Sequence, residues 1–242
     1  MAKTTNNTKV NGKRQIMSKT LFIPLVAITA ISWICMAYMV FFWVPSDSAQ
    51  GIAQRIFYYH VPTAWVSFLG FGIALFYSVM YLIKRNLDFD SKAAANAITA
   101  WVFTTGVIIT GPLWAKPIWG DFWNWKDQRL ISFFVLWLIY AGYLLLRTGI
   151  TDPHKKARFS SVLGIVAFFN VPLVYLAIRI WNTPVHPAAV FAGDKKSGLV
   201  DPKMRITFLV SMIAFTLLYF IVSHLFNNYL YQERKLNEKR GN

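Results

Sequence analysis

The sequence predicts an all-α, polytopic membrane protein with six transmembrane helices and both termini in the cytoplasm. Two observations predict this fold class. Only 14% of the 242 residues are charged, whereas a soluble domain carries about 25%. In addition, six apolar runs approach the roughly 20 residues that a helix needs to cross the hydrocarbon core. The connections between these runs are too short to hold a soluble domain.

The six runs define the predicted spans in chain order. The first is too long for the apolar segment of a cleaved signal peptide. The second opens at Pro62, a residue that suits the first turn of a helix, and the others follow short polar connections. The predicted spans cover residues 21–43, 62–83, 97–114, 130–147, 159–180 and 206–227.

The distribution of basic residues predicts the orientation. Sixteen of the 25 Lys and Arg residues lie on the side shared by the two termini, and nine lie on the opposite side. Because Lys and Arg accumulate in cytoplasmic loops, both termini are predicted to be cytoplasmic. The net charge of +15 is therefore interpreted as a topology signal, and we expect no nucleic-acid partner.

This topology divides the chain into three parts. We expect a cytoplasmic tail at 1–20, a six-helix transmembrane domain at 21–228 and a second cytoplasmic tail at 229–242. The domain is expected to carry a tryptophan-rich outer loop at about 115–129. The chain contains no Walker-type nucleotide motif and no C-x-x-C-H motif for covalent haem attachment. Its single cysteine, Cys35, cannot form an internal disulfide.

The outer loop contains the stretch WGDFWNWKDQRL at 119–130, and four of the ten tryptophans fall between 114 and 125. Tryptophans at a membrane boundary commonly form an aromatic belt, which is the simpler interpretation. A belt needs only one or two tryptophans per helix end, however. The density of Trp119, Trp123 and Trp125 instead favours a surface for a flat ligand.

Two of the four histidines, His60 and His186, are predicted to lie on the same outer face as this loop. Each could be an ordinary helix-end residue, but imidazole is also a common ligand of transition metals. Zinc usually takes four ligands, often including cysteine, and the outer loops contain no cysteine. Haem needs only one or two axial ligands and offers a large flat face, so it fits these residues better.

At these residues the sequence resembles a known family. The stretch WGDFWNWKDQR is similar to the tryptophan-rich signature of haem-handling membrane proteins with a WWD domain. HVPTAW at 60–65, NVPLVY at 170–175 and WNTPVH at 181–186 are similar to the segments that flank it in one branch. The order of these segments covers nearly the whole chain. It resembles the cytochrome c maturation protein C family, also called haem exporter protein C or CcmC.

The resemblance implies a haem-delivery protein of the bacterial inner membrane rather than an enzyme. It implies non-covalent haem on the periplasmic face, with His60 and His186 as the axial ligands of the iron and Trp119, Trp123 and Trp125 as the platform. The implied partners are a periplasmic haem chaperone (CcmE-like), an ABC-type ATPase with its membrane subunit (CcmA/CcmB-like), a small single-span subunit and membrane lipid.

The loop departs from the family pattern at two positions. Phe122 stands where the family usually has tryptophan, which preserves an aromatic side chain, and Lys126 intervenes before Asp127. The haem propionates need cationic or amide partners, for which Arg55, Lys126 and Arg129 are nearby candidates. Asp127 and Arg129 are kept as candidate haem contacts, with their separate roles left open.

Two other functions compete with this interpretation. A cytochrome c synthase-type subunit belongs to the same superfamily, but those relatives are longer and carry further histidines inside the membrane. A secondary transporter is expected to show repeats, broken helices or ionisable residues at mid-membrane. The six runs show little of that kind.

Overall fold

The computed structural model describes residues 19–48, 50–180, 199 and 201–240, and within these ranges the chain is helical with no β-strand. Six helical stretches of the described chain are long and apolar enough to cross a membrane. The predicted all-α fold with six membrane-spanning helices is therefore confirmed. These spans cover Thr20–Trp43, Ile52–Lys84, Leu87–Trp119, Gln128–Gly149, Pro153–Val174 and Pro202–Arg240.

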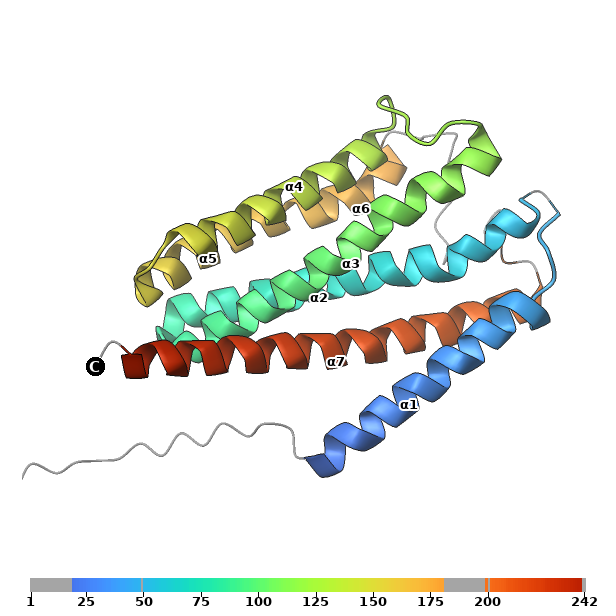
Figure 1. The fold of residues 1–242 in the computed structure, drawn as a ribbon. Coiled ribbons are helices and arrows are strands. Elements are labelled where there is room, and N and C mark those ends of the chain that lie inside the picture. The colour runs from blue at the N-terminus through green and yellow to red at the C-terminus, as the bar shows by residue number, and fades with distance from the viewer. Residues whose placement is uncertain (1–18, 49, 181–198, 200, 241–242) are drawn as a thin grey trace, which may run out of the picture.

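The helices from α1 to α6 follow one another with short connections (Figure 1). The first helix ends in a π-helical turn, η1, and a 3-10 turn, η2, precedes the second helix. The elements are α1 (Lys19–Tyr38), η1 (Met39–Trp43), η2 (Ile52–Ile56), α2 (Phe57–Lys84), α3 (Leu87–Trp119), α4 (Gln128–Gly149), α5 (Pro153–Phe168), α6 (Asn170–Ile180) and α7 (Pro202–Arg240).

The paired helices α2 and α3 form the centre of the molecule, with α7 and α1 on one side and α4, α5 and α6 on the other (Figure 1). One apolar cluster joins α1, α2 and α7, and a second joins α2 to α3, α4, α5 and α6. The indole of Trp33 fixes α1 against α7 because its Nε1 donates to the Ala214 carbonyl at 3.2 Å. We call the end with residues 44–56 and 120–127 the loop end, and the other the opposite end.

The central helices begin earlier than the hydropathy of the sequence predicts. α3 starts at Leu87 rather than near 97 because the Asn86 side chain caps it, accepting from the Asp88 amide at 2.8 Å. Asp88 and Asp90 also favour this terminus, since carboxylates stabilise the positive end of a helix dipole. Pro62 lies in the second turn of α2 rather than the first, because η2 and Phe57 start the helix upstream.

The fifth span is divided, which departs from the expectation of unbroken helices. α5 ends at Phe168 and α6 begins at Asn170. Pro172 lacks the N–H that would bond the Phe168 carbonyl in a continuous helix, so the ladder is interrupted there. The Asn170 side chain donates from Nδ2 to the Ser132 carbonyl of α4 at 3.1 Å, which ties the break to its neighbour.

Ion pairs join the helices at the opposite end. Asp90 of α3 binds both terminal nitrogens of Arg147 on α4, at 2.6 and 2.9 Å, and both side chains are largely buried. Asp88 pairs with Arg234 near the end of α7. Planar guanidinium and carboxylate groups match in this two-bond geometry, so the first turn of α3 is held to both flanking helices.

Candidate functional site

His60 lies in the first turn of α2 at the loop end, where its ring contacts α3. The His60 Nδ1 lies 2.9 Å from the Thr110 hydroxyl oxygen. That hydroxyl has one hydrogen, which it donates to the Gly106 carbonyl at 2.8 Å. Thr110 therefore accepts from His60, so Nδ1 carries the ring hydrogen and Nε2 keeps a lone pair. This is the tautomer that can ligate a metal through Nε2.

Close packing against α3 also orients the imidazole. The ring centre of His60 lies 5.6 Å from that of Trp114, with the planes inclined by 56°. Gly111 leaves room for the imidazole, since a Cβ at that position would lie 3.4 Å from His60 Cε1. Thr110, Gly111 and Trp114 thus build one wall for the histidine.

Trp114 is a buried residue that the predicted set of site residues did not include. Its Nε1 donates to the Gln50 side-chain oxygen at 3.2 Å, which ties the connection before α2 to α3. Thr110 was missed as well. The sequence signal for both residues was their spacing, because Thr110 and Trp114 are four residues apart and so lie on the same face of a helix. Choosing that face of α3 as part of the site requires knowing that His60 packs against it.

The structure divides the predicted tryptophan platform into two groups. Trp119 belongs to the His60 group, with its ring centre 6.3 Å from that of Trp114. Trp123 and Trp125 contact each other at 5.6 Å, and they pack at 6.0 and 6.2 Å against Phe134 on α4. The three tryptophans therefore lie in two groups, one beside Trp114 on α3 and one against Phe134 on α4, rather than in one stack.

The tip of the loop presents aromatic surface outward. Phe122 and Trp125 are 54% and 67% exposed. Gly120 turns the chain out of α3 with a φ of +85°, a conformation that glycine adopts without strain. Lys116 steadies this turn, since its ammonium donates to the Gly120 carbonyl at 2.6 Å and lies 5.2 Å from the Phe122 ring centre.

Asp127 and Arg129 lie where the loop enters α4. Asp127 is buried and caps the helix, accepting from the Arg129 and Leu130 amides at 2.9 and 3.4 Å. Arg129 lies within electrostatic range of His60. Its Nη1 is buried and has no hydrogen-bond partner among the described residues. Arg129 and His60 therefore lie at the same end of the bundle.

Two more buried donors lie at the loop end without hydrogen-bond partners among the described residues, namely Arg55 Nε on η2 and Trp123 Nε1. Unpaired buried donors cost free energy, so these groups are candidates for binding an acceptor. His186 lies outside the described residues. His154 and His224 lie toward the opposite end, where His154 accepts from Tyr81 through its carbonyl at 3.1 Å.

Comparison of the sequence with known proteins identifies the family of this chain. A family model described as "Heme exporter protein C" matches residues 6–240. The "Heme exporter protein C" of Bradyrhizobium diazoefficiens is 34% identical over 218 residues, which is 87% of this chain and 81% of that protein. The Escherichia coli protein of the same name is 32% identical over 201 residues, covering 81% of this chain and 78% of that protein.

A mitochondrial protein gives a similar match. A "putative cytochrome c biosynthesis ccmC-like mitochondrial protein" of Marchantia polymorpha is 34% identical over 156 residues, covering 64% of this chain and 65% of that protein. Since the family match extends over both central helices, the tryptophan loop and α7, this chain belongs to the heme exporter protein C family.

Proposed function

We propose that this protein holds haem non-covalently at the outer face of the bacterial cytoplasmic membrane and delivers it for cytochrome c maturation. His60 and His186 serve as the two axial ligands. The observation that carries the proposal is the hydrogen-bonded pair of His60 and Thr110, which leaves the His60 Nε2 lone pair available. Family membership supports haem as the ligand of this histidine.

The surroundings of His60 suit the other parts of haem. Trp114 and Trp119 beside the histidine supply apolar surface for the porphyrin. The propionates are carboxylates, and the unpartnered donors of Arg129 and Arg55 are the groups they need. The indole N–H of Trp123 adds a neutral donor. Asp127 positions Arg129 by capping the helix that carries it.

The exposed loop tip suits delivery rather than permanent storage. Two axial ligands saturate the iron, which favours holding haem over activating oxygen. The exposed rings of Phe122 and Trp125 offer a partner a contact beside the bound haem. We propose that a periplasmic haem chaperone docks there and that an ABC-type ATPase with its membrane subunit, with or without a small single-span subunit, supplies the energy of release. The chain itself then acts as a carrier and not as an enzyme.

An absorption spectrum of the purified protein with bound haem tests the ligand assignment. The wild type is expected to show the spectrum of six-coordinate, low-spin haem. His60→Ala and His186→Ala should each lose most of the co-purified haem or shift its spectrum toward five-coordinate iron.

His154→Ala is the matched control, because this histidine lies at the opposite end and should leave the haem content unchanged. Equal haem content and identical spectra in both outer-face variants and in the wild type would refute the assignment. Energy-dependent uptake of another solute into proteoliposomes would instead favour a transporter.

A further inference from the structure

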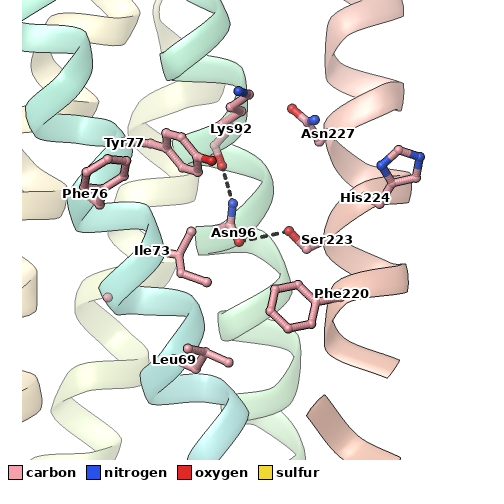
Figure 2. Close-up of a pocket in the computed structure, with 11 residues that line it drawn as sticks. Leu69, Ile73, Phe76, Tyr77, Lys92, Asn96, Phe220, Ser223, His224 and Asn227 are labelled. Carbon is pink, nitrogen blue, oxygen red and sulfur yellow. Dashed lines mark hydrogen bonds between the residues drawn. The ribbon is translucent and has the colours of Figure 1, made fainter. Parts of the chain in front are cut away.

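A groove of about 630 Å³ lies between α2, α3 and α7, far from the haem-binding residues proposed above (Figure 2). Its apolar wall consists of Leu69, Ile73 and Phe76 from α2, with Phe220 from α7. Polar side chains of Tyr77, Lys92 and Asn96 line its upper part, toward the opposite end. The groove is therefore amphipathic along its length.

The polar end carries a cation. Lys92 is half-buried, and its ammonium lies 5.2 Å from the Tyr77 ring centre and 5.8 Å from that of Phe89. The two nearby carboxylates of α3 are already paired, Asp88 with Arg234 and Asp90 with Arg147. Among the described residues, Lys92 has no carboxylate partner, so its charge remains available to an anion.

The polar groups around Asn96 already bond one another. The Asn96 Oδ1 accepts from the hydroxyls of Tyr219 and of Ser223, the latter at 2.9 Å. Its Nδ2 donates to the Lys92 carbonyl at 2.8 Å. Because these groups bond each other, the Asn96 side chain needs no polar partner from a ligand. The section of the groove beside Ile73 and Phe220 therefore suits an apolar chain.

The three helices approach one another closely beside Leu69. A Cβ at Gly70 would lie 2.8 Å from both the Ala100 Cβ and the Tyr219 Cε2, so α2, α3 and α7 are in tight contact there. From Leu69 to Tyr77 the groove follows eight residues of α2, about 12 Å at 1.5 Å per residue. One leaflet of the hydrocarbon core is about 15 Å deep, so the length matches a single acyl chain.

We propose that this groove binds an anionic phospholipid, with the phosphate at Lys92 and one acyl chain along Ile73 and Phe220. The membrane side is the one that the basic residues predict to be cytoplasmic, where anionic lipids attract Lys and Arg. A lipid fits better than haem at this place. The imidazole of His224 is already engaged, with Asn228 Nδ2 2.8 Å from its Nε2 and the Phe22 ring 5.7 Å away.

Native mass spectrometry of the full chain in detergent tests this proposal. The protein is titrated with phosphatidylglycerol and with phosphatidylcholine of the same acyl chains. Phosphatidylglycerol is expected to bind about fivefold more tightly, the effect of one basic residue at the surface. Lys92→Gln should abolish this preference, and Lys92→Arg should retain it.

Lys84→Gln is the matched control, because Lys84 is an exposed cation at the same end of α2 but not in the groove. It should keep the wild-type preference. Ile73→Trp fills the groove and should remove one bound lipid of either kind. The variant protein should elute from size exclusion at the same volume as the wild type.

Three results would each overturn the proposal. The first is equal binding of the two lipids to the wild type, and the second is an unchanged preference for phosphatidylglycerol in Lys92→Gln. The third is that added haem displaces phosphatidylglycerol from the wild type but not from Lys92→Gln. The last result would identify the groove as a second haem site. The His60 spectrum is a separate readout, so the outcome does not depend on the ligand assignment at the loop end.

Discussion

At the scale of single residues, a threonine decides which nitrogen of His60 faces outward. Threonine in a helix commonly donates its hydroxyl hydrogen back to a carbonyl one turn earlier. Thr110 does so with Gly106, which leaves only its lone pairs for His60. The same hydroxyl thereby orients the ring and sets its tautomer. Partners of this kind typically change metal affinity by about 10- to 100-fold.

Replacement of Thr110 tests this role. Thr110→Val removes the acceptor but preserves the shape of the side chain, so we expect haem affinity to fall by about 10- to 100-fold. Thr110→Ser restores the hydroxyl and should recover most of the affinity. Haem titration followed by absorbance measures the change, and the reduction potential of the bound haem should shift with it. A valine variant with wild-type affinity and potential would show that Thr110 is only a packing residue.

Arg129 gives a second prediction at this scale. If its buried Nη1 binds a propionate, Arg129→Gln should weaken haem binding by about 10- to 100-fold, the value of a charge-assisted hydrogen bond. The same substitution should have little effect on haem dimethyl ester, which lacks the carboxylates. Comparing the two ligands in a binding titration separates this contact from general damage. An equal loss for both ligands would assign Arg129 a structural role instead.

At the scale of elements, α3 connects both ends of the molecule. Its first turn is held by Asp88 and Asp90, and its last turns carry Thr110, Trp114 and Trp119. α2 runs against it and contributes His60. The distance between the Thr110 and His60 side chains therefore depends on how these two helices are packed, and the pairing of Asp90 with Arg147 fixes α3 to α4 as well.

Breaking that ion pair should destabilise the bundle. Arg147→Met leaves the Asp90 carboxylate buried without its partner, which should lower the free energy of unfolding by about 3–5 kcal/mol. The double variant Asp90→Leu with Arg147→Met removes both charges and should recover most of that loss. Unfolding in sodium dodecyl sulfate measures these differences.

The exposed pair of Lys235 with Glu238, at 2.7 Å, is the matched control. Lys235→Met should change the stability by less than about 1 kcal/mol because water screens this pair. A double variant as unstable as Arg147→Met would show that packing, not the unpaired charge, causes the loss.

At the scale of the whole molecule, an even number of spans would place both termini on one side, and the basic residues predict that side to be the cytoplasm. This orientation would expose the tryptophan loop on the outer face and the groove of Lys92 in the inner leaflet. It is the premise shared by the proposed haem site and by the proposed lipid site.

Labelling of single cysteines tests the orientation. In a Cys35→Ser background, which leaves no native thiol, Lys126→Cys on the loop should react with a membrane-impermeant maleimide in intact spheroplasts. Lys155→Cys, in the first turn of α5, should react only after lysis. Both positions are exposed. The reverse pattern would invert the topology and move the haem site to the cytoplasm.

Much of the molecule could be predicted from local sequence patterns. Apolar runs near the length of a bilayer can satisfy their backbone only as helices, so six spans followed from hydropathy, and the spacing of histidines and tryptophans indicated the ligand class. The starts of α2 and α3 were missed because their first turns are polar or 3-10 helical, which hydropathy does not register. The division of the fifth span depends on Pro172 and Asn170.

The sequence by itself determined the membrane-spanning helical class and the family, and it predicted the residue types of the proposed haem site. Only the tertiary structure decided that Thr110 sets the His60 tautomer, that Trp114 packs beside it and that the three loop tryptophans divide between α3 and α4. The physical reason is distance along the chain. His60 and Thr110 are 50 residues apart, and their contact arises from the packing of two helices, which no local periodicity specifies.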